Sequence, residues 1–476
     1  MRKCHLSKRK FIQGSAAASA LYSLVPHTVL GANERINIGV IGTGGMGGGH
    51  CRRFNTGESR VIAVSDVDTS RMGKVEGAAQ HQDLRKLLEM KDVDAVVIAT
   101  PNHWHSLAAI WSMQAGKHVY VEKPVSHNIW EGRQMVSAAR KYKRVCQAGT
   151  QQRSCPAVQA AARDVQAGKY GKVLWVHCSK LAARKPIGKV TAPTTPPASV
   201  DYNLWAGPGP MSPVMRKSFH YDWHWQFDWG DGEMANWGVH YIDDLRHILG
   251  WDDVPANVIS VGNRFWDDDG DTPNMQFSVM EHRGVKVVID IRNLPGAEGA
   301  GGGSGGAVYL GSRGGNYIMC EKGLIRIARG GGAGYDLDKN RIAQYKGDGG
   351  KDHAANFLKA VRAGDSALLN AEIAVGHQST VMCHQANIAW QVGQASSPDQ
   401  LRSEFKDHQD ALDTFDSMLA QLASNEINLT QMPLIAGPRL AYDNQTEKFI
   451  GAHAEHANQY LRSAGRNEFV VPEVTC

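Results

Sequence analysis

The sequence predicts an α/β protein in which a doubly wound parallel sheet precedes a second α/β domain with an open, mostly antiparallel sheet. Three observations support this: a glycine-rich turn joins an early strand to a helix, strands and helices alternate after it, and closely spaced strands follow later. The chain has 476 residues, of which 42% are hydrophobic and 21% are charged. This composition is typical of a globular protein with two or three domains.

The glycine-rich turn predicts a dinucleotide-binding site. An apolar, β-branched strand at 36–41 leads into a G-x-G-x-x-G run and then into a helix that continues to about residue 54. In such a turn the glycines allow a tight bend, close approach of a pyrophosphate and close helix–strand packing, while the helix N-terminus holds the phosphates. The cofactor-binding residues expected here are Gly42, Thr43, Gly44, Met46 and Gly47.

The second strand, at 61–64, is followed by an acidic residue that indicates which dinucleotide binds. Asp66 stands where a carboxylate accepts hydrogen bonds from the adenosine ribose. Because this carboxylate would repel a 2′-phosphate, we expect NAD as the cofactor. Arg71 is near enough in the sequence to keep NADP as the alternative.

Strands and helices alternate over the rest of the first domain, as in a Rossmann fold. Two turns lie at the carboxyl ends of predicted strands, where such sheets bind ligands: residues 100–105 (TPNHWH) and residues 122–124 (EKP). The expected elements are helices at 83–90, 105–115 and 129–142 and strands at 94–100, 117–121 and 145–149.

The combination of GTGGMG, TPNHWH and EKP, in this order, resembles the Gfo/Idh/MocA oxidoreductases, from residue 36 to about residue 393. The resemblance implies that Lys123 lies between the nicotinamide and the substrate. A lysine beside a nicotinamide cation would have a lowered pKa and could act as a base, whereas the simpler interpretation is a surface lysine before a turn proline. The resemblance extends the expected cofactor contacts to Thr100, Pro101, Asn102, His105, Glu122, Lys123 and Gln151.

A second chemical motif lies in residues 219–244, which are rich in tryptophan and histidine. Aromatic faces suit the apolar faces of sugar rings, but an aromatic core or a subunit interface would show the same composition. Members of the family carry D-x-G-x-H-x-x-D here, so the resemblance makes His240 the acid/base histidine, and Asn236 replaces the usual aspartate. An amide can bind a hydroxyl but cannot take its proton. The expected catalytic residues are Lys123, Asn236 and His240, and the expected substrate-binding residues are Lys123, Arg153, Trp223, Asn236, Trp237 and His240.

The same motif raises the question of a metal. His220, His224 and His240, helped by Asp243, could in principle ligate one, but the run is loop-like and tryptophan-rich. We therefore expect no metal site.

The remaining pattern divides the chain into a leader (1–32), a Rossmann domain (33–155), a second domain (156–393) and an extension (394–476). A long Pro-rich and Thr-rich segment at 182–213 predicts a functional loop, and residues 296–306 predict a flexible glycine loop. The expected strands of the second domain are at 173–179, 308–310, 317–320 and 324–327 and in a hairpin at 274–292. The expected helices are at 156–167, 233–249, 352–362, 371–391 and 398–423.

The first residues predict export from the cytoplasm. A basic segment precedes a mildly apolar, Ala- and Ser-rich stretch, and residues 7–12 (SKRKFI) resemble a twin-arginine signal with Lys8 in place of the first arginine. A disordered basic leader is the alternative. We expect a periplasmic or otherwise exported protein, since this route carries folded, cofactor-loaded enzymes.

Composition excludes several other classes. The net charge of +5 is small, and basic residues form no sustained stripe beyond the leader, so we expect no nucleic-acid partner. The 8 cysteines show no paired metal-binding spacing. We expect no stable membrane span.

Three functions remain open. The first is NAD(P)-dependent oxidation or reduction of a sugar, sugar acid or polyol with a tightly bound cofactor. The second is NAD-dependent glycoside cleavage by oxidation and elimination, which the missing aspartate keeps open. The third is a non-catalytic carbohydrate-binding envelope protein. In each case we expect a small-molecule carbohydrate partner and a homo-oligomer, a dimer or tetramer.

Overall fold

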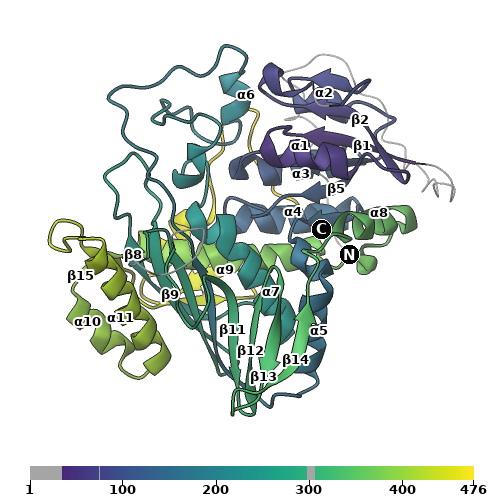
Figure 1. The fold of residues 1–476 in the computed structure, drawn as a ribbon. Helices are drawn as coiled ribbons and strands as arrows, with labels where there is room; N and C mark the ends of the chain where they lie inside the picture. Colours follow the sequence, from purple (N-terminus) through teal and green to yellow (C-terminus); the bar gives the residue numbers. More distant parts are fainter. Residues whose placement is uncertain (1–34, 74, 297–305, 476) are drawn as a thin grey trace, which may run out of the picture.

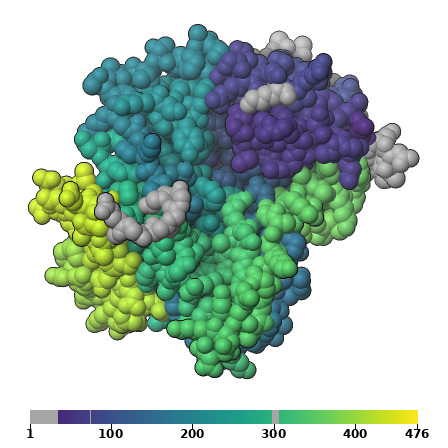
Figure 2. Space-filling model, viewed as in Figure 1, coloured from purple at the N-terminus to yellow at the C-terminus, as the bar shows by residue number. Residues whose placement is uncertain are grey.

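The structure is a computed structural model that describes residues 35–73, 75–296 and 306–475 (Figure 1). The predicted leader (1–32) and nearly all of the predicted glycine loop (296–306) lie outside these residues. Two sheets organise the described chain. Figure 2 shows the residues of the first sheet, in purple and blue, forming a lobe against the teal and green residues of the second.

The first sheet is a parallel, doubly wound sheet, as predicted. Its six strands lie in the order β3-β2-β1-β4-β5-β6, and every pair in it is parallel. The strands are β1 (Ile36–Ile41), β2 (Ser59–Ser65), β3 (Ala79–His81), β4 (Ala95–Ile98), β5 (His118–Val121) and β6 (Cys146–Ala148).

Helices bury both faces of this sheet. The helices α2 (Leu84–Leu88), α3 (His105–Gln114) and α4 (Ile129–Lys141) cover one face. The other face is covered by α1 (Gly45–Arg53) and, from far along the chain, by α8 (His353–Ala363). Strands buried on both faces explain the continuous apolar runs of the sequence.

The second sheet has twelve strands and is mostly antiparallel, as predicted. Its main path is β14-β13-β12-β11-β7-β10-β9-β8-β16-β15, and β7 pairs with β10 in parallel. The strands are β7 (Val173–Leu181), β8 (Asn257–Asn263), β9 (Met275–His282), β10 (Val285–Arg292), β11 (Gly314–Cys320), β12 (Gly323–Ala328), β13 (Gly331–Tyr335), β14 (Arg341–Lys346), β15 (Gln394–Ser396), β16 (Leu434–Ala436), β17 (Leu440–Asp443) and β18 (Lys448–Ile450).

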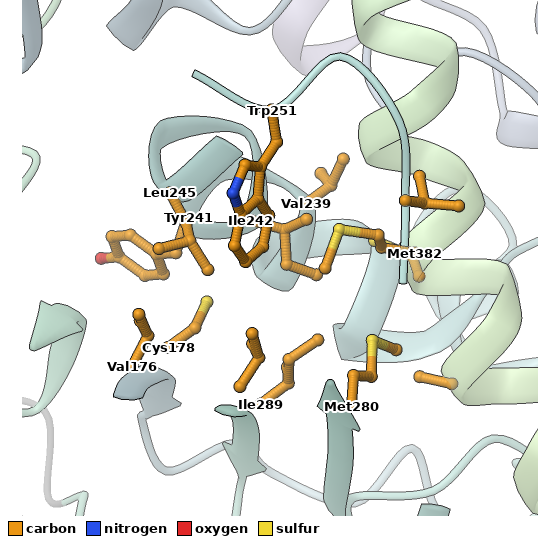
Figure 3. Close-up of a cluster of buried hydrophobic side chains, with 14 of the residues drawn as sticks. Val176, Cys178, Val239, Tyr241, Ile242, Leu245, Trp251, Met280, Ile289 and Met382 are labelled. Atoms are coloured by element: carbon orange, nitrogen blue, oxygen red, sulfur yellow. The ribbon is translucent and has the colours of Figure 1, made fainter. Parts of the chain in front are cut away.

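One face of this sheet forms the main core of the second domain. Val176 and Cys178 on β7 and Ile289 on β10 lie opposite Ile242 and Leu245 on α7 (Val239–Leu249), as Figure 3 shows. The helices α5 (Pro156–Gln166) and α9 (Ile373–Gln391) complete the cover. On the other face, α10 (Pro398–Phe405) and α11 (Gln409–Ser424) lie over β8, β9 and β10.

The structure differs from the predicted elements in a few places. Residues 308–310 form no strand: Tyr309 makes only an isolated bridge to Ser312. The predicted helix at 398–423 is two helices, because the chain turns between Phe405 and Gln409. The expected elements do not include the short helices α6 (Tyr202–Ala206) and α12 (Ala454–Asn458) or the strands β3, β8, β13, β14, β15, β16, β17 and β18.

No helix in the described part of the chain is long and apolar enough to cross a membrane. The C-terminal segment instead returns to the first lobe, where Phe469, Val471 and Val474 enter the core formed with α3 and α4. The short helices α12 (Ala454–Asn458) and Gln459–Leu461 precede this segment.

Candidate active site

The glycine-rich turn has the shape of a phosphate cradle. Gly42 has a φ of 80°, which favours glycine, and a Cβ on Gly47 would lie 1.7 Å from the carbonyl oxygen of Gly42. The helix α1 therefore begins directly against the end of β1, and only glycine permits this contact. Met46, at the start of the helix, is half exposed.

Asp66 lies beside this turn, at the end of β2. Its Oδ2 accepts hydrogen bonds from the backbone N and Oγ1 of Thr43, at 2.7 and 3.2 Å. The Arg71 guanidinium also lies close to the turn, since a Cβ on Gly44 would come within 2.7 Å of it. The structure therefore brings together the acidic residue expected to favour NAD and the arginine that kept NADP open.

The two turns at the ends of β4 and β5 are tied together by His105. One ring nitrogen lies 2.9 Å from the carbonyl oxygen of Thr100, and the other lies 2.6 Å from that of Pro124. His105 is buried, so its role here is to hold the turn with Lys123 against the turn with Pro101. Asn102 is also buried, and its amide donates to Asp231 Oδ2 at 2.8 Å.

Lys123 reaches from the first domain to the second. Its Nζ donates to the backbone oxygen of Asn236 at 2.8 Å and to Asn236 Oδ1 at 3.2 Å. Burial lowers the pKa of Lys123; the charges of Glu122 and Glu233 oppose this effect. A lysine with a lowered pKa at a domain junction is suited to proton transfer.

Glu122 is the acidic neighbour of Lys123, and a histidine on α1 fixes its carboxylate. It accepts a hydrogen bond from His50 Nε2 at 2.8 Å. Burial acts to raise the pKa of Glu122, but the bond to His50 and the charges of His50 and Lys123 outweigh it, so the pKa is lowered. Gln151 Nε2 reaches the same carboxylate at 3.4 Å, so the predicted residues Glu122, Lys123 and Gln151 lie together.

His240 lies at the start of α7, one turn beyond Asn236. Burial lowers the pKa of His240 well below its ordinary value, and the charges of Lys123, Arg329 and Lys180 lower it further. The ring is therefore neutral at physiological pH. Its Nδ1 is buried and has no hydrogen-bond partner within the described residues, which leaves it open to a bound ligand.

The segment that carries Asn236 is a π turn, from Met234 to Gly238, rather than the continuous α-helix predicted for 233–249. Such turns often occur at functional sites. The helix α7 follows at once and ends at Gly250, whose φ is 67°, as the sequence indicated.

Two family profiles match this chain. Residues 36–150 match the description "Oxidoreductase family, NAD-binding Rossmann fold", and residues 162–316 match "Oxidoreductase family, C-terminal alpha/beta domain". The chain belongs to the Gfo/Idh/MocA oxidoreductases.

Several relatives with curated names match about a third of the chain. Inositol 2-dehydrogenase 1 of Saccharopolyspora erythraea is 36% identical over 157 residues, which are 31% of this chain and 47% of that protein. A glycosyl hydrolase family 109 protein of Solibacter usitatus is 33% identical over 150 residues, 28% of this chain and 33% of that protein. The chain thus spans about half, or less, of the length of these relatives.

Solved structures share the fold at low identity. The WlbA dehydrogenase of Bordetella pertussis, in complex with NADH and UDP-GlcNAcA, has a TM-score of 0.55 and 18% identity, over 74% of this chain and 95% of that one. Levoglucosan dehydrogenase in complex with NADH gives the same TM-score and identity, over 74% of this chain and 96% of that one. At this identity the likeness concerns the fold alone.

Within this Gfo/Idh/MocA member, sequence reasoning missed Glu233. Its carboxylate is fully buried, accepts from Asn236 Nδ2 at 3.1 Å and pairs with Arg184 at 2.9 Å. Glu233 lies three residues before Asn236 and seven before His240, so helical spacing could have indicated it. It supplies a carboxylate near the site although Asn236 replaces the usual aspartate.

Sequence reasoning also missed Lys180 and Arg329. Lys180 Nζ lies 4.2 Å from the centroid of the Trp237 ring, and Arg329 Cζ lies 5.5 Å from it. Trp237 itself was predicted and does lie beside His240, with ring centroids 5.6 Å apart. At least one face of this indole is therefore occupied by a cation and is not available for stacking on a sugar.

Two predicted substrate residues lie elsewhere. The guanidinium of Arg153 is buried and bound to Asp243 and His247, with an Nε–Oδ2 distance of 2.8 Å to Asp243. It is held there by the buried carboxylate of Asp243 on α7, whose other oxygen accepts from Ser379 Oγ at 2.6 Å. Trp223 is buried in an aromatic cluster and stacks on His224, so its ring already packs within the protein.

The histidines considered for a metal do not gather. His220 Nε2 bonds to Asp68 at 2.8 Å, at the end of β2, and His224 Nδ1 bonds to the backbone oxygen of Tyr221. Within residues 35–73, 75–296 and 306–475, no three His, Cys, Asp or Glu side chains are grouped as metal ligands.

A cavity of about 340 Å³ lies on the face of the second sheet that is opposite α7. Tyr309, Arg326 and Tyr335 line it. The residues expected to perform chemistry do not, so this cavity is not the candidate active site.

Proposed function

We propose that the protein is an NAD-dependent oxidoreductase that transfers a hydride between a carbohydrate and the nicotinamide ring. The carbohydrate is a sugar, a sugar acid or a polyol. The observation that carries the proposal is that Lys123 of the first domain contacts Asn236 of the second, beside the unpaired ring of His240. The names of relatives, which include inositol and levoglucosan dehydrogenases, support the same substrate class.

The residues of the first domain fit this cofactor. The glycine-rich turn lets the N-terminus of α1 begin directly against the end of β1, where a pyrophosphate would bind, and the buried Oγ1 of Thr100 has no hydrogen-bond partner in the described chain. Asp66, beside this turn, would accept hydrogen bonds from the ribose hydroxyls. Bound NAD would supply the hydride acceptor for the oxidation.

The chain's own residues manage the proton. Lys123, with its lowered pKa, would bind the reacting hydroxyl and help to remove its proton. His240, neutral and buried, would accept that proton on a ring nitrogen. Asn236 would align the carbohydrate through its amide, and Glu233 holds that amide in position.

We propose further that the protein is exported and keeps its cofactor through successive oxidation and reduction. The basic and then apolar leader supports export, and free NAD is scarce outside the cytoplasm.

We propose also that copies of the chain associate through the second sheet. Three hydrophobic residues are exposed there: Leu174 on β7, Ile342 on β14 and Leu337 in the turn before β14. Light scattering tests the association, and periplasmic fractionation tests the export.

A second candidate function is NAD-dependent glycoside cleavage by oxidation and elimination. Two observations favour it: Asn236 replaces the aspartate of the family, and a glycosyl hydrolase family 109 protein is among the relatives. Oxidation of a ring hydroxyl acidifies the neighbouring C–H, so that the glycosidic bond can leave without net redox change.

The test is to denature the purified full-length protein, to identify the released nucleotide by mass spectrometry and to add a carbohydrate panel to the intact protein. We expect NAD to be released and a carbohydrate to change the absorbance of the reduced nicotinamide. Release of an aryl group from aryl glycosides, with NAD needed only in catalytic amounts, would favour the second function. A protein without nucleotide affinity would overturn both.

A further inference from the structure

The cations beside His240 are more numerous than a neutral substrate requires. Lys180, Arg184 and Arg329 come from three separate segments of the second domain, and all three act electrostatically on Lys123, on His240 or on each other. Of these, Arg184 has a carboxylate partner, Glu233. No ion pair joins Lys180 or Arg329 to any carboxylate within residues 35–73, 75–296 and 306–475.

The sheet explains why these two side chains meet. On β7, Val176 and Cys178 face α7, and Lys180 continues the same row, since alternate residues of a strand share a face. On β12, Ile325 and Ile327 face the same core, and Arg329 continues their row just beyond the strand. Each of these two apolar rows therefore ends in a cation, at the end of the strands that is nearest His240.

The pairing of the strands places these row ends together. Lys180 is opposite Gly314 on β11, and Asn316 on β11 is opposite Ile327 on β12. The carboxyl ends of β7 and β12 thus lie at the same end of the sheet, separated by the glycine-rich start of β11. Trp237, from the π turn, lies under both cations.

Holding the charges of Lys180 and Arg329 close together is energetically unfavourable when no anion is bound. Both side chains are partly buried, and burial lowers the pKa of Lys180. The charge of Glu233 opposes this effect, but Glu233 is already paired with Arg184, and the charges of Arg184 and Arg329 lower the pKa of Lys180 further. Like charges in a partly buried cluster call for an anion. The phosphates of a dinucleotide do not supply it, because their cradle lies at the other domain's β1–α1 turn.

We infer that Lys180 and Arg329 receive the oxyanion of an acidic carbohydrate, a carboxylate or a phosphate ester, while Lys123 and His240 act on its hydroxyl. This inference rests on the proposed function and narrows its substrate class. Trp237 serves as the support of the two cations, which keeps them directed into the site. The planar fork of Arg329 suits bidentate binding of such an oxyanion.

The experiment measures binding to the full-length protein loaded with NADH, by calorimetry. The probes are glucuronate and galacturonate, their methyl esters, glucose 6-phosphate, and glucose. We expect one of the acidic probes to bind roughly tenfold or more tightly than its uncharged counterpart. Preference for a uronate over glucose 6-phosphate, or the reverse, identifies which oxyanion the site takes.

The variants are Lys180→Gln and Arg329→Gln, and Arg326→Gln is the matched control, because Arg326 is an exposed arginine on the same strand that lies over Tyr317. Each of the first two should remove the preference for the acid and leave the affinity of the ester unchanged, whereas the control keeps the preference. Equal binding of acid and ester by the unaltered protein, or an unchanged preference in both variants, would overturn the inference. NADH affinity, measured alongside, shows that each variant is folded.

The outcomes separate this inference from the proposed function. Tight binding of the acid without hydride transfer would contradict the proposed reaction and leave the oxyanion site standing. Turnover of neutral sugars with no preference for acids would support the reaction and contradict the oxyanion site.

Discussion

At the scale of single residues, Lys123 links the two domains to the chemistry. Its amine contacts Asn236, its pKa is lowered by burial, and its neighbours Glu122 and Glu233 are both held by other partners. A base of this kind gains activity as the pH rises through its pKa. The pH dependence of oxidation therefore reports on this residue.

We predict that Lys123→Ala lowers kcat by roughly a hundredfold or more, because the group that orients and deprotonates the hydroxyl is lost. The variant should still bind NADH, since the glycine cradle and Asp66 are untouched. In the unaltered protein, the rising limb of the pH–rate profile should lie below the ordinary pKa of lysine, in accord with the lowered pKa. A variant that remains active, or keeps that limb, would contradict the assignment.

A second residue-scale prediction concerns the amide at position 236. In Asn236→Asp, a carboxylate would replace an amide that donates to the fully buried Glu233. The added negative charge next to Nζ should raise the pKa of Lys123, so the rising limb of the pH–rate profile should move to higher pH. Stability should fall by about 1–3 kcal/mol because Glu233 loses a donor and gains a like charge.

The control is the double variant Asn236→Asp with Glu233→Gln, which removes the repulsion. It should recover part of the lost stability in denaturant titrations, because it also removes the ion pair between Glu233 and Arg184. If the single variant is as stable as the unaltered protein and its pH profile does not move, Asn236 does not separate the two charges as we infer.

At the scale of elements, local pattern predicted most of the first sheet and its turns. Each of its strands but β3 is a short apolar run followed by a turn residue, so the chain alone indicates where it ends. The strands β13 and β14 escaped prediction because residues 331–335 (GGAGY) and 341–346 (RIAQYK) lack the alternating apolar pattern. They form because each pairs with a neighbour across the sheet.

In the candidate site, too, the residues that lie in sequence motifs could be predicted, and the residues that only the sheet brings together could not. Lys123, Asn236 and His240 lie in motifs, so sequence reasoning could name them. Lys180 and Arg329 are 149 residues apart and meet only through the register of β7, β11 and β12. Nothing in either local sequence carries that information. Conversely, the sequence predicted that Arg153 binds substrate, because the residues around it do not reveal its buried partner, Asp243, which is 90 residues away.

The start of α4 carries an element-scale prediction. Asn128 caps the helix and donates to Glu131 Oε1 at 2.7 Å, while the other carboxylate oxygen of Glu131 is buried without a partner in the described chain. Burial raises the pKa of Glu131 to about 7, and the charge of Asp231 adds to this effect. The pKa of Glu131 in the folded protein exceeds its ordinary value of 4.5, so protonation of Glu131 stabilises the folded protein. This stabilisation is complete below 4.5 and is lost as the pH rises through about 7.

Glu131→Gln should therefore stabilise the protein at about pH 8, by at most about 3 kcal/mol, and the gain should fade as the pH falls from about 7 to the ordinary value of 4.5. Thermal unfolding across this pH range measures it. Glu89→Gln, at an exposed position after α2, is the control and should show no such trend. A gain of equal size in acid and in base would show that the ionisation of Glu131 does not cause the gain, and would contradict the prediction.

At the scale of the whole molecule, the C-terminal segment joins the two domains. Arg466 donates to the backbone oxygen and Oδ1 of Asn203, and Val474 N donates to Gln134 on α4 at 2.7 Å. Between them, Phe469 is fully buried against Trp104 and Trp111, with ring centroids 5.5 and 6.3 Å away. The segment thus supports the turn that contains Asn102 and His105.

We predict that Phe469→Ala lowers stability by about 3–5 kcal/mol, because it leaves a cavity in the core of the first domain. Val470→Ala, at a neighbouring position that is 42% exposed, is the control and should change stability by less than about 0.5 kcal/mol. Denaturant unfolding followed by tryptophan fluorescence measures both. Because Trp104 lies in the turn that carries the expected cofactor contacts Asn102 and His105, loosening it should also weaken NADH binding. If Phe469→Ala lost stability but bound NADH with unchanged affinity, the C-terminal segment would support the fold without supporting the cofactor turn.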